Sequence, residues 1–381
     1  MNLNLCFKIR VIFYESNMRS FQYLPVSFKR CLKLLTPNST RTLKKFSDNT
    51  EINSDMVQEF VKFSSSANNP SDKHDKQTIA NVMKRWQEIF IKENIAEPKE
   101  SIQHITASII GITKLSDLAK LQNEQLSEEQ LQKLEILCEC RLSRMPVQYL
   151  IGQWDFRDIT LKLEPPIFIP RPETEILVEL MLKRMNDFGN KSCEILEIGC
   201  GSGAICLSLL QSRKNLRVVA IDINPHACDL TKENAKNLNL EMGLILLNAK
   251  LNETGNISVK KNYTSSQPLK FEQLRFDFIV SNPPYIPTQR IFSLQPEVRV
   301  YEDIKALNGG NDGLRLIKPI LLYASVALND DGFLILEIDS SHCEQIKMLV
   351  EENYAGKLQF ESVYKDFNEN DRYVEIKRIH R

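Results

Sequence analysis

The sequence has no run of about 18 consecutive apolar residues, so it contains no apolar helix long enough to span a bilayer. Its five histidines are isolated, and its nine cysteines are scattered. The closest cysteine pair, Cys138 and Cys140, has one residue between them, which fits neither a zinc knuckle nor a Cys-x-x-Cys redox pair. We therefore expect neither a membrane span nor a metal site.

The chain also lacks net charge, because 49 basic residues balance 49 acidic ones. A protein that binds DNA or RNA directly needs a cationic surface for the phosphates, so we expect no direct nucleic-acid substrate. The sequence does contain 381 residues with ordinary apolar and charged fractions, enough for two folded domains plus extensions. It has no internal repeats.

The charges are unevenly distributed along the chain. Residues 1–46 contain nine Lys or Arg, a single acid (Glu15) and many Ser and Thr, without the unbroken apolar core of a secretory signal. This composition is typical of an organelle transit peptide, and the alternative is a disordered basic tail for nucleic acid. Residues 47–76 are polar, and we interpret them as a linker.

Helical periodicity begins at Thr78 and predicts a small helical domain over residues 77–145. Its first helix has an apolar face formed by Ile79, Val82, Met83, Trp86, Ile89 and Phe90. A second helix is expected around 102–110, and a third begins at the capping residue Ser127. Residues 146–175 follow as an interdomain connector, which the alternative interpretation makes a rigid hinge. Within it, Phe168 is placed to line a pocket.

Residues 176–381 have the pattern of an α/β domain. Strands are predicted at 194–198, 216–221, 243–247, from 277, at 332–338, 358–364 and 372–379, with helices between most of them. The polar stretch 248–273 is interpreted as a surface loop inserted between the third and fourth strands.

The first predicted strand ends in Gly199-Cys200-Gly201-Ser202-Gly203, and glycines at a strand-to-helix turn let the backbone approach a ligand closely. The second strand ends in Asp222, where an acid can accept hydrogen bonds from both ribose hydroxyls of a nucleoside. The alternative is that Asp222 only caps the next helix.

The fourth strand ends in Asn282-Pro283-Pro284-Tyr285, at the sheet edge where open α/β folds bind ligands. The side-chain oxygen of Asn282 and the carbonyl of Pro283 can accept the two N–H bonds of a planar NH2 group, while Tyr285 stacks on it. The alternative is a Pro-Pro turn with a capping Asn. Four successive strand ends therefore supply a glycine loop, a ribose-type acid, a polar loop and an amide-binding corner, which is the layout of a nucleoside-cofactor transferase. The glycine-rich stretch 306–314 is expected to pack as a lid over the acceptor pocket.

These residues resemble the HemK/PrmC family of protein-glutamine methyltransferases over about 78–379. The matching motifs are Pro146-x-Gln148-Tyr149-x-x-Gly152, Phe168-x-Pro170-Arg171-Pro172-Glu173-Thr174-Glu175, Glu197-x-Gly199-x-Gly201-x-Gly203, Asp222, Asn282 to Tyr285, and Ala306-Leu307-x-Gly309-Gly310-x-Asp312-Gly313-Leu314. The Pro-Arg-Pro-Glu-Thr-Glu stretch is the specific one, because Asn-Pro-Pro-Tyr also occurs in adenine-amino methyltransferases.

The resemblance implies a class I methyltransferase fold, a Rossmann-like seven-stranded sheet with an antiparallel last strand, preceded by a helical substrate-recognition domain. It implies methyl transfer from S-adenosylmethionine to the glutamine of the Gly-Gly-Gln motif in a peptide-chain release factor. With the basic leader, it implies a mitochondrial matrix enzyme.

The same resemblance assigns roles to individual residues. The catalytic residues would be Asn282, Pro283 and Tyr285, and the substrate-binding residues would be these three with Phe168 and Pro284. The cofactor would be bound by Glu197, Gly199, Cys200, Gly201, Ser202, Gly203, Asp222, Ile223, Asn248, Ala249 and Asn282.

Three short stretches depart from the family pattern. Asn248-Ala249-Lys250 stands where an acid is common near the cofactor adenine, Glu302-Asp303 replaces Glu-Pro, and Asp339-Ser340-Ser341-His342 replaces a glycine-containing pattern. Two other functions compete with the main prediction. One is an adenine-amino methyltransferase on DNA or RNA, and the other is a non-catalytic scaffold with the same fold.

Overall fold

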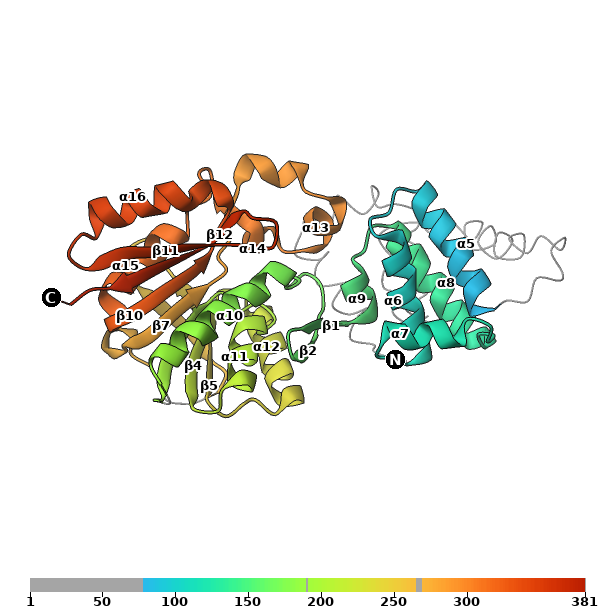
Figure 1. The fold of residues 1–381 in the computed structure, drawn as a ribbon, viewed down its shortest axis with the longest axis horizontal. Coiled ribbons are helices and arrows are strands. Elements are labelled where there is room, and N and C mark those ends of the chain that lie inside the picture. Colours follow the sequence, from blue (N-terminus) through green and yellow to red (C-terminus); the bar gives the residue numbers. More distant parts are fainter. Residues whose placement is uncertain (1–77, 190, 265–268, 381) are drawn as a thin grey trace, which may run out of the picture. The chain divides into compact units, whose positions relative to one another are not determined.

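A computed structural model describes residues 78–189, 191–264 and 269–380 (Figure 1). The predicted leader (1–46) and linker (47–76) lie outside the described residues. The chain divides into two units, one ending at Ile151 and the other beginning at Gly152. This division falls inside the stretch 146–175 that the sequence analysis treats as a connector.

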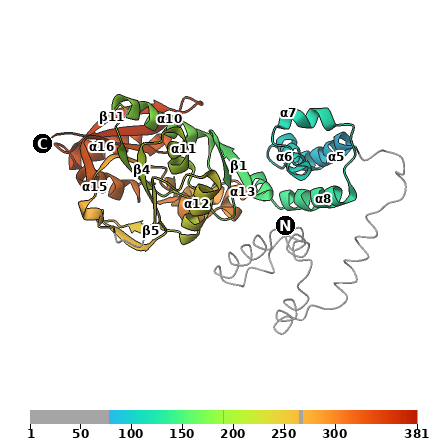
Figure 2. The same cartoon turned by 90° about the horizontal axis from the view of Figure 1, so that it is seen from below.

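The first unit is helical, as predicted (Figure 2). Its helices are α5 (Ile79–Lys92), α6 (Pro98–Ile110), α7 (Leu115–Leu118), α8 (Glu128–Leu142) and α9 (Val147–Ile151), with a 3-10 turn at Ala119–Leu121. The predicted face of α5 is the buried one, with Ile79, Val82, Trp86 and Phe90 inside. Helix α8 begins with a capping box, in which Ser127 and Gln130 each bond the other's backbone N–H.

The second unit is organised around one eight-stranded sheet. In spatial order its strands are β11 (Leu358–Lys365), β12 (Asp371–Arg378), β10 (Leu328–Glu337), β7 (Phe276–Ser281), β3 (Cys193–Ile198), β4 (Leu216–Asp222), β5 (Leu244–Leu251) and β6 (Ile257–Asn262). The pairs between β10 and β5 are parallel, whereas β12 runs antiparallel to both of its neighbours. The sheet thus confirms the predicted mostly parallel architecture with an antiparallel last strand.

Helices cover both faces of the sheet. Buried residues of α15 (Ile317–Ala327) and α16 (Cys343–Asn353) join one apolar cluster with the strands. On the other face lie α10 (Pro172–Asp187), α11 (Ala204–Ser212) and α12 (Pro225–Leu238) (Figure 1). Helix α10 starts at Pro172 with Glu173 and Glu175 in its first turn, as predicted from the helix dipole.

One fold prediction is wrong, because the stretch 248–273 is not a single long loop. Strand β5 continues to Leu251, and the chain turns at 252–256 and returns as β6, which pairs antiparallel with β5 and adds an eighth strand to the predicted seven. An edge strand has one side in solvent and can therefore be polar. The Lys-rich sequence of β6 gave no apolar run by which to recognise it.

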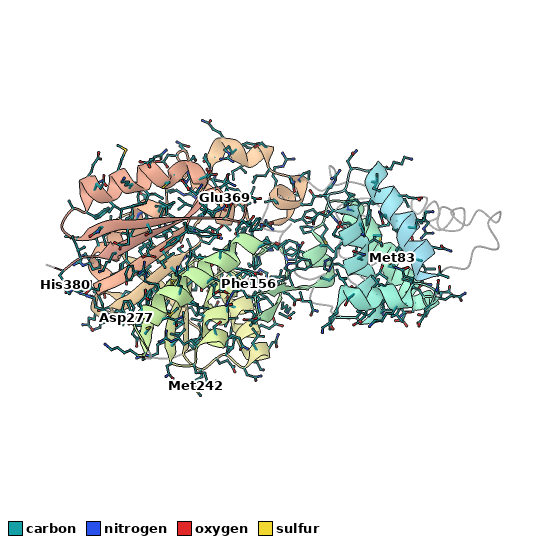
Figure 3. The ribbon with its side chains drawn as sticks, viewed as in Figure 1. Met83, Phe156, Met242, Asp277, Glu369 and His380 are labelled. Carbon is teal, nitrogen blue, oxygen red and sulfur yellow. The ribbon has the colours of Figure 1, made fainter. Side chains whose placement is uncertain are left out.

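A second feature without a sequence signal is the hairpin of β1 (Gln153–Phe156) and β2 (Ile159–Lys162) at the start of this unit. Phe156, labelled in Figure 3, is buried at the end of β1. The hairpin is held to α12 because Asn234 accepts the Lys162 N–H and donates to the Lys162 carbonyl. The stretch 146–175, interpreted as an interdomain connector, therefore contains paired strands.

Candidate cofactor and acceptor site

The strand order places the candidate site. From β3 the chain proceeds outward through β4 and β5, then returns to lay β7 on the other side of β3. The carboxyl ends of β3 and β7 thus lie at a topological switch point, the place where open α/β sheets bind ligands. The loop 199–203 follows β3, and Asn282 follows β7. Ser281 joins the two strand ends, since its hydroxyl donates to the Ile198 carbonyl at 2.6 Å.

Two glycines of the 199–203 loop leave open space in front of the backbone. Gly199 and Gly201 have φ values of 85° and 57°, and a Cβ at either position would meet no other atom within 4 Å. At Gly203 a Cβ would lie 2.9 Å from Leu207 Cδ1, so that glycine serves packing of α11. Cys200 and Ser202 are buried. The loop therefore leaves its backbone bare at Gly199 and Gly201, and that a ligand binds there stays a prediction.

Asp222 holds this loop in place. Its carboxylate accepts the Gly201 N–H at 3.0 Å and the Asn224 N–H at 2.8 Å. Burial raises the pKa of Asp222, and the nearby Asp303 adds to the rise, while the N–H donors oppose it. The N-cap of α12 is Asn224, whose side chain accepts the His226 N–H. Asp222 is therefore not itself the helix cap that the sequence analysis kept as an alternative.

Asn248 lies beside Asp222, paired with it across β4 and β5. Its Nδ2 donates to the carbonyls of both Asp222 and Ile223, each at 2.9 Å, which an ionised acid at this position could not do. Ile223 is half exposed, and Ala249 is buried. Asn248, which departs from the family pattern, thus holds the backbone of Asp222 and Ile223 in place.

Glu197 is buried at the end of β3 and accepts the Cys206 N–H at 3.0 Å. Its carboxyl group therefore joins the end of β3 to the first turn of α11, across the glycine loop. Burial raises the pKa of Glu197 from 4.5 to about 8.

Glu197 should make the protein less stable as the pH rises. Its carboxyl is protonated in the folded protein up to a pH of about 8 but ionises near 4.5 when unfolded, so the unfolded state is favoured progressively between those values. Glu197→Gln keeps an acceptor for Cys206 and should remove this pH dependence, which amounts to about 3 kcal/mol of unfolding free energy between pH 5.5 and 8. Urea unfolding of both proteins at pH 5.5 and 8 measures the difference. An equal change of unfolding free energy in both proteins between the two pH values would contradict this prediction.

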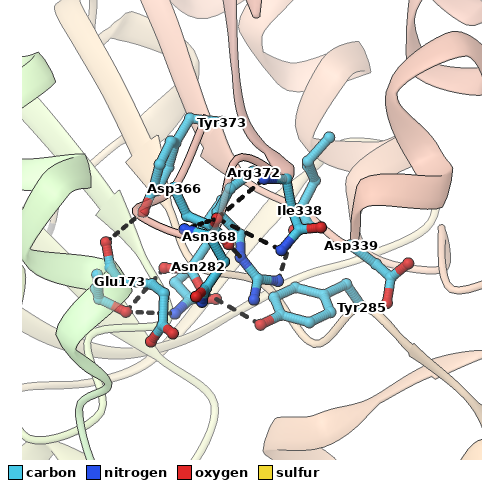
Figure 4. A network of polar contacts seen from close by, with 12 residues as sticks. Glu173, Asn282, Tyr285, Ile338, Asp339, Asp366, Asn368, Arg372 and Tyr373 are labelled. Atoms are coloured by element: carbon cyan, nitrogen blue, oxygen red, sulfur yellow. Dashed lines mark hydrogen bonds and ion pairs between the residues drawn. The ribbon is translucent and has the colours of Figure 1, made fainter. Parts of the chain in front are cut away.

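The corner after β7 is held by side chains from three other elements (Figure 4). Asn282 Nδ2 donates to Thr174 Oγ1 at 3.1 Å, and the Tyr285 hydroxyl donates to Glu337 Oε1 at 3.2 Å. The Arg372 guanidinium lies 5.8 Å from the centre of the Tyr285 ring. Burial and the Glu337 charge raise the pKa of Tyr285, so its phenol stays neutral at physiological pH.

The glycine-rich stretch packs behind this corner. Strand β9 (Asn308–Gly310) pairs with β8 (Ile286–Pro287), directly after Tyr285. A Cβ at Gly309 would lie 2.7 Å from the Pro284 carbonyl oxygen, and one at Gly313 would lie 2.5 Å from that of Tyr285. Only glycine allows so close an approach. The stretch therefore supports the backbone of the corner; that it also acts as a lid stays a prediction.

Phe168 is half-buried, and its ring lies 4.9 Å from the Arg171 guanidinium, which pairs with the buried Glu302. The structure also brings in residues that sequence reasoning did not assign to the site: Thr174, Glu337 and Arg372. Thr174 belongs to the quoted Pro-Arg-Pro-Glu-Thr-Glu stretch, but its bond to Glu337 joins residues 163 apart in sequence. No local pattern signals such a contact.

Among residues 78–380, apart from the gaps at 190 and 265–268, no cluster of three or more His, Cys, Asp or Glu could hold a metal ion. Over the same part of the chain, no helix has both the length and the apolar character needed to cross a membrane.

Comparison with known proteins gives consistent matches. Two family models match this chain, PrmC N-terminal domain over residues 81–152 and Methyltransferase small domain over 172–294. The chain is 38% identical over 303 residues to the MTRF1L release factor glutamine methyltransferase of Homo sapiens, covering 78% of this chain and 86% of that protein. It is 30% identical over 305 residues to the release factor glutamine methyltransferase of Fusobacterium nucleatum, covering 80% of each. The corresponding protein of Lactococcus lactis is 32% identical over 289 residues, covering 75% of this chain and 97% of that protein.

Proposed function

The chain belongs to the family of release factor glutamine methyltransferases, and from that premise we propose that it methylates the side-chain amide nitrogen of the glutamine in the Gly-Gly-Gln motif of a peptide-chain release factor. The observation that carries the proposal is the orientation of Asn282. Its Nδ2 is bound to Thr174, so its oxygen is left to accept a hydrogen bond at the switch point. Such an acceptor suits an amide NH2 group.

The residues around the switch point fit S-adenosylmethionine as the cofactor. The open backbone at Gly199 and Gly201 suits close approach of the amino acid part, and the Asp222 carboxylate suits the ribose hydroxyls. The half-exposed Ile223 and the anchored Asn248 suit the flat adenine. When bound, this cofactor supplies an electrophilic methyl group on a positively charged sulfur.

The residues of the corner then orient the nucleophile. Asn282 Oδ1 and the Pro283 carbonyl accept the two N–H bonds of the glutamine amide, and Tyr285 stacks on its plane. As the nitrogen gains positive charge, its N–H bonds become stronger donors, so these acceptors stabilise the transition state more than the ground state. Tyr285 is neutral and bound to Glu337, which fits a positioning role rather than that of a base.

A methylation assay tests the proposal. The purified protein is incubated with methyl-labelled S-adenosylmethionine and a release factor, and in parallel with the same factor carrying Gly-Gly-Ala in place of Gly-Gly-Gln. Label should enter only the first, at the glutamine. A third incubation contains double-stranded DNA or RNA instead of the release factor, and label there with none in the release factor would overturn the assignment.

The two competing functions are less well supported. An adenine-amino methyltransferase would need a cationic surface, and the chain has no net charge. The named relatives are release factor glutamine methyltransferases, which favours glutamine over adenine and an enzyme over a non-catalytic scaffold.

The basic composition of residues 1–46 supports mitochondrial import, with the enzyme acting in the matrix on a mitochondrial release factor. Deleting residues 1–46 should abolish mitochondrial localisation in cells while the purified protein keeps its kcat. Fluorescence of a tagged protein and N-terminal sequencing of the imported form measure this. A mature protein that still begins at Met1 would contradict cleavage of the leader.

A further inference from the structure

We propose that Thr174 and Glu337 are positioning residues that determine which end of the Asn282 side-chain amide faces the acceptor group. The inference rests on the proposed function only in taking that group to be a planar NH2. It assigns a role to two buried residues that lie outside the predicted site, one on α10 and one at the end of β10.

The direction of each hydrogen bond follows from the donors available. Glu337 as a carboxylate can only accept, and its Oε2 accepts from Thr174 Oγ1 at 2.8 Å. A threonine hydroxyl has a single hydrogen, so Thr174 has none left for Asn282 and must accept there. The Asn282 atom 3.1 Å from Thr174 Oγ1 is therefore the Nδ2 donor. Oδ1 is left as the end that meets a ligand.

The Glu337 carboxylate also holds Tyr285, another residue proposed to bind the acceptor group. Glu337 Oε1 accepts the Tyr285 hydroxyl at 3.2 Å, so one buried side chain fixes Tyr285 directly and Asn282 through Thr174. Burial raises the pKa of Glu337, and the two hydroxyl donors and the charge of the nearby Arg372 oppose that rise. Arg372 itself donates to the Ile338 carbonyl and faces the Tyr285 ring (Figure 4).

The orientation matters because the amide has two unlike ends. If the Asn282 amide were turned over, its NH2 would face the NH2 of the acceptor, and two donors would oppose each other. Misplacement of a reacting group typically costs on the order of a hundredfold in rate. A buried carboxylate is, moreover, weak evidence for stability, because apolar residues of similar size often stabilise a core equally well. Glu337 is better explained by the order it imposes on the corner.

A matched pair of variants at Thr174 tests whether Glu337 orients Asn282 through Thr174. Thr174→Val removes the hydroxyl with little change of shape and should lower kcat on a release factor on the order of ten- to a hundredfold, with KM for S-adenosylmethionine unchanged. Thr174→Ser keeps the hydroxyl and should recover most of that loss. The control is Thr106→Val, because Thr106 is equally buried in α6 and its hydroxyl has no hydrogen-bond partner among the residues that the structure describes.

Glu337→Gln separates positioning from stability. A glutamine can donate to Thr174, which allows the hydroxyl to turn and donate to Asn282, so that the amide reverses. We expect kcat to fall while the midpoint of thermal unfolding changes little, since a buried charge is removed but Arg372 keeps its ion pair with Asp366. A parallel fall of the midpoint and kcat would indicate a purely structural role and overturn the inference.

A readout without any substrate keeps this inference distinct from the proposed function. In protein labelled with ¹⁵N-asparagine, the side-chain NH2 signals of Asn282 are identified by their loss in Asn282→Ala. Their exchange with solvent should be slow in the wild type and in Thr174→Ser, and on the order of tenfold faster in Thr174→Val, since an amide held by a buried partner exchanges only on opening. Equal exchange in all three proteins would overturn the inference, whether or not a release factor is methylated.

Discussion

Asn282→Ala is expected to lower kcat on a release factor by about a hundred- to a thousandfold, the usual loss when one preorganised transition-state partner is removed. Affinity for S-adenosylmethionine should change much less, because the main cofactor contacts proposed here lie on β3, β4 and β5. Single-turnover methylation of the Gly-Gly-Gln glutamine, with calorimetry for the cofactor, measures both quantities.

Asn282→Asp refines this test. Aspartate keeps an acceptor for the glutamine N–H and should retain more activity than alanine. It should stay below the wild type, because it cannot donate to Thr174 and brings a second negative charge towards Glu337. If the aspartate variant folds and binds cofactor but is as inactive as alanine, the acceptor model is wrong. A fully active Asn282→Ala would remove the corner from the active site.

Asp222→Ala is expected to weaken S-adenosylmethionine binding by about 1.5–3 kcal/mol, roughly 10- to 150-fold in Kd. The ribose hydroxyls would lose their acceptor. The Gly201 and Asn224 N–H groups would also lose theirs, which loosens the loop that meets the cofactor. Isothermal titration calorimetry with the purified protein measures the change.

Asp277→Ala provides a matched control for Asp222→Ala. Asp277, labelled in Figure 3, is near the start of β7, whereas Asp222 is at the carboxyl end of β4. Asp277 accepts the Glu194 N–H and a hydrogen bond from the Asn329 side chain. Its loss should lower the unfolding midpoint without changing cofactor affinity. If the two variants weaken binding equally, Asp222 acts through stability alone and not through the ribose.

The sequence predicted best the features that are local. A buried parallel strand is recognised as an unbroken apolar run, and the glycine loop as a pattern of five consecutive residues. Ser127 is recognised as an N-cap from the residues that directly follow it. From these, the sheet and the position of its switch point could be inferred, while the roles of the residues there stay predictions. The helical unit was predicted for the same reason, since the apolar face of α5 repeats at helical spacing.

Features built from distant partners could not be predicted in this way. Thr174 and Glu337 meet only because α10 packs against β10, and nothing around either residue indicates the other. The polar strand β6 is defined by its pairing with β5 rather than by its composition. The departure from the family pattern at 248 likewise did not reveal that Asn248 donates two hydrogen bonds to the backbone of Asp222 and Ile223, which an ionised acid could not make.

Strand β6 has a further consequence for behaviour in concentrated solution. An open sheet presents unpaired backbone groups along its two outer strands, and another chain can add to them and start aggregation. Here β6 covers β5 and places Lys260 and Lys261 on the outside, while the opposite outer strand, β11, is interrupted by a bulge at Glu361. Charge and irregularity both disfavour strand addition. Strand β6, which the sequence led us to interpret as part of a loop, thus shields the largely apolar strand β5 from pairing with another chain.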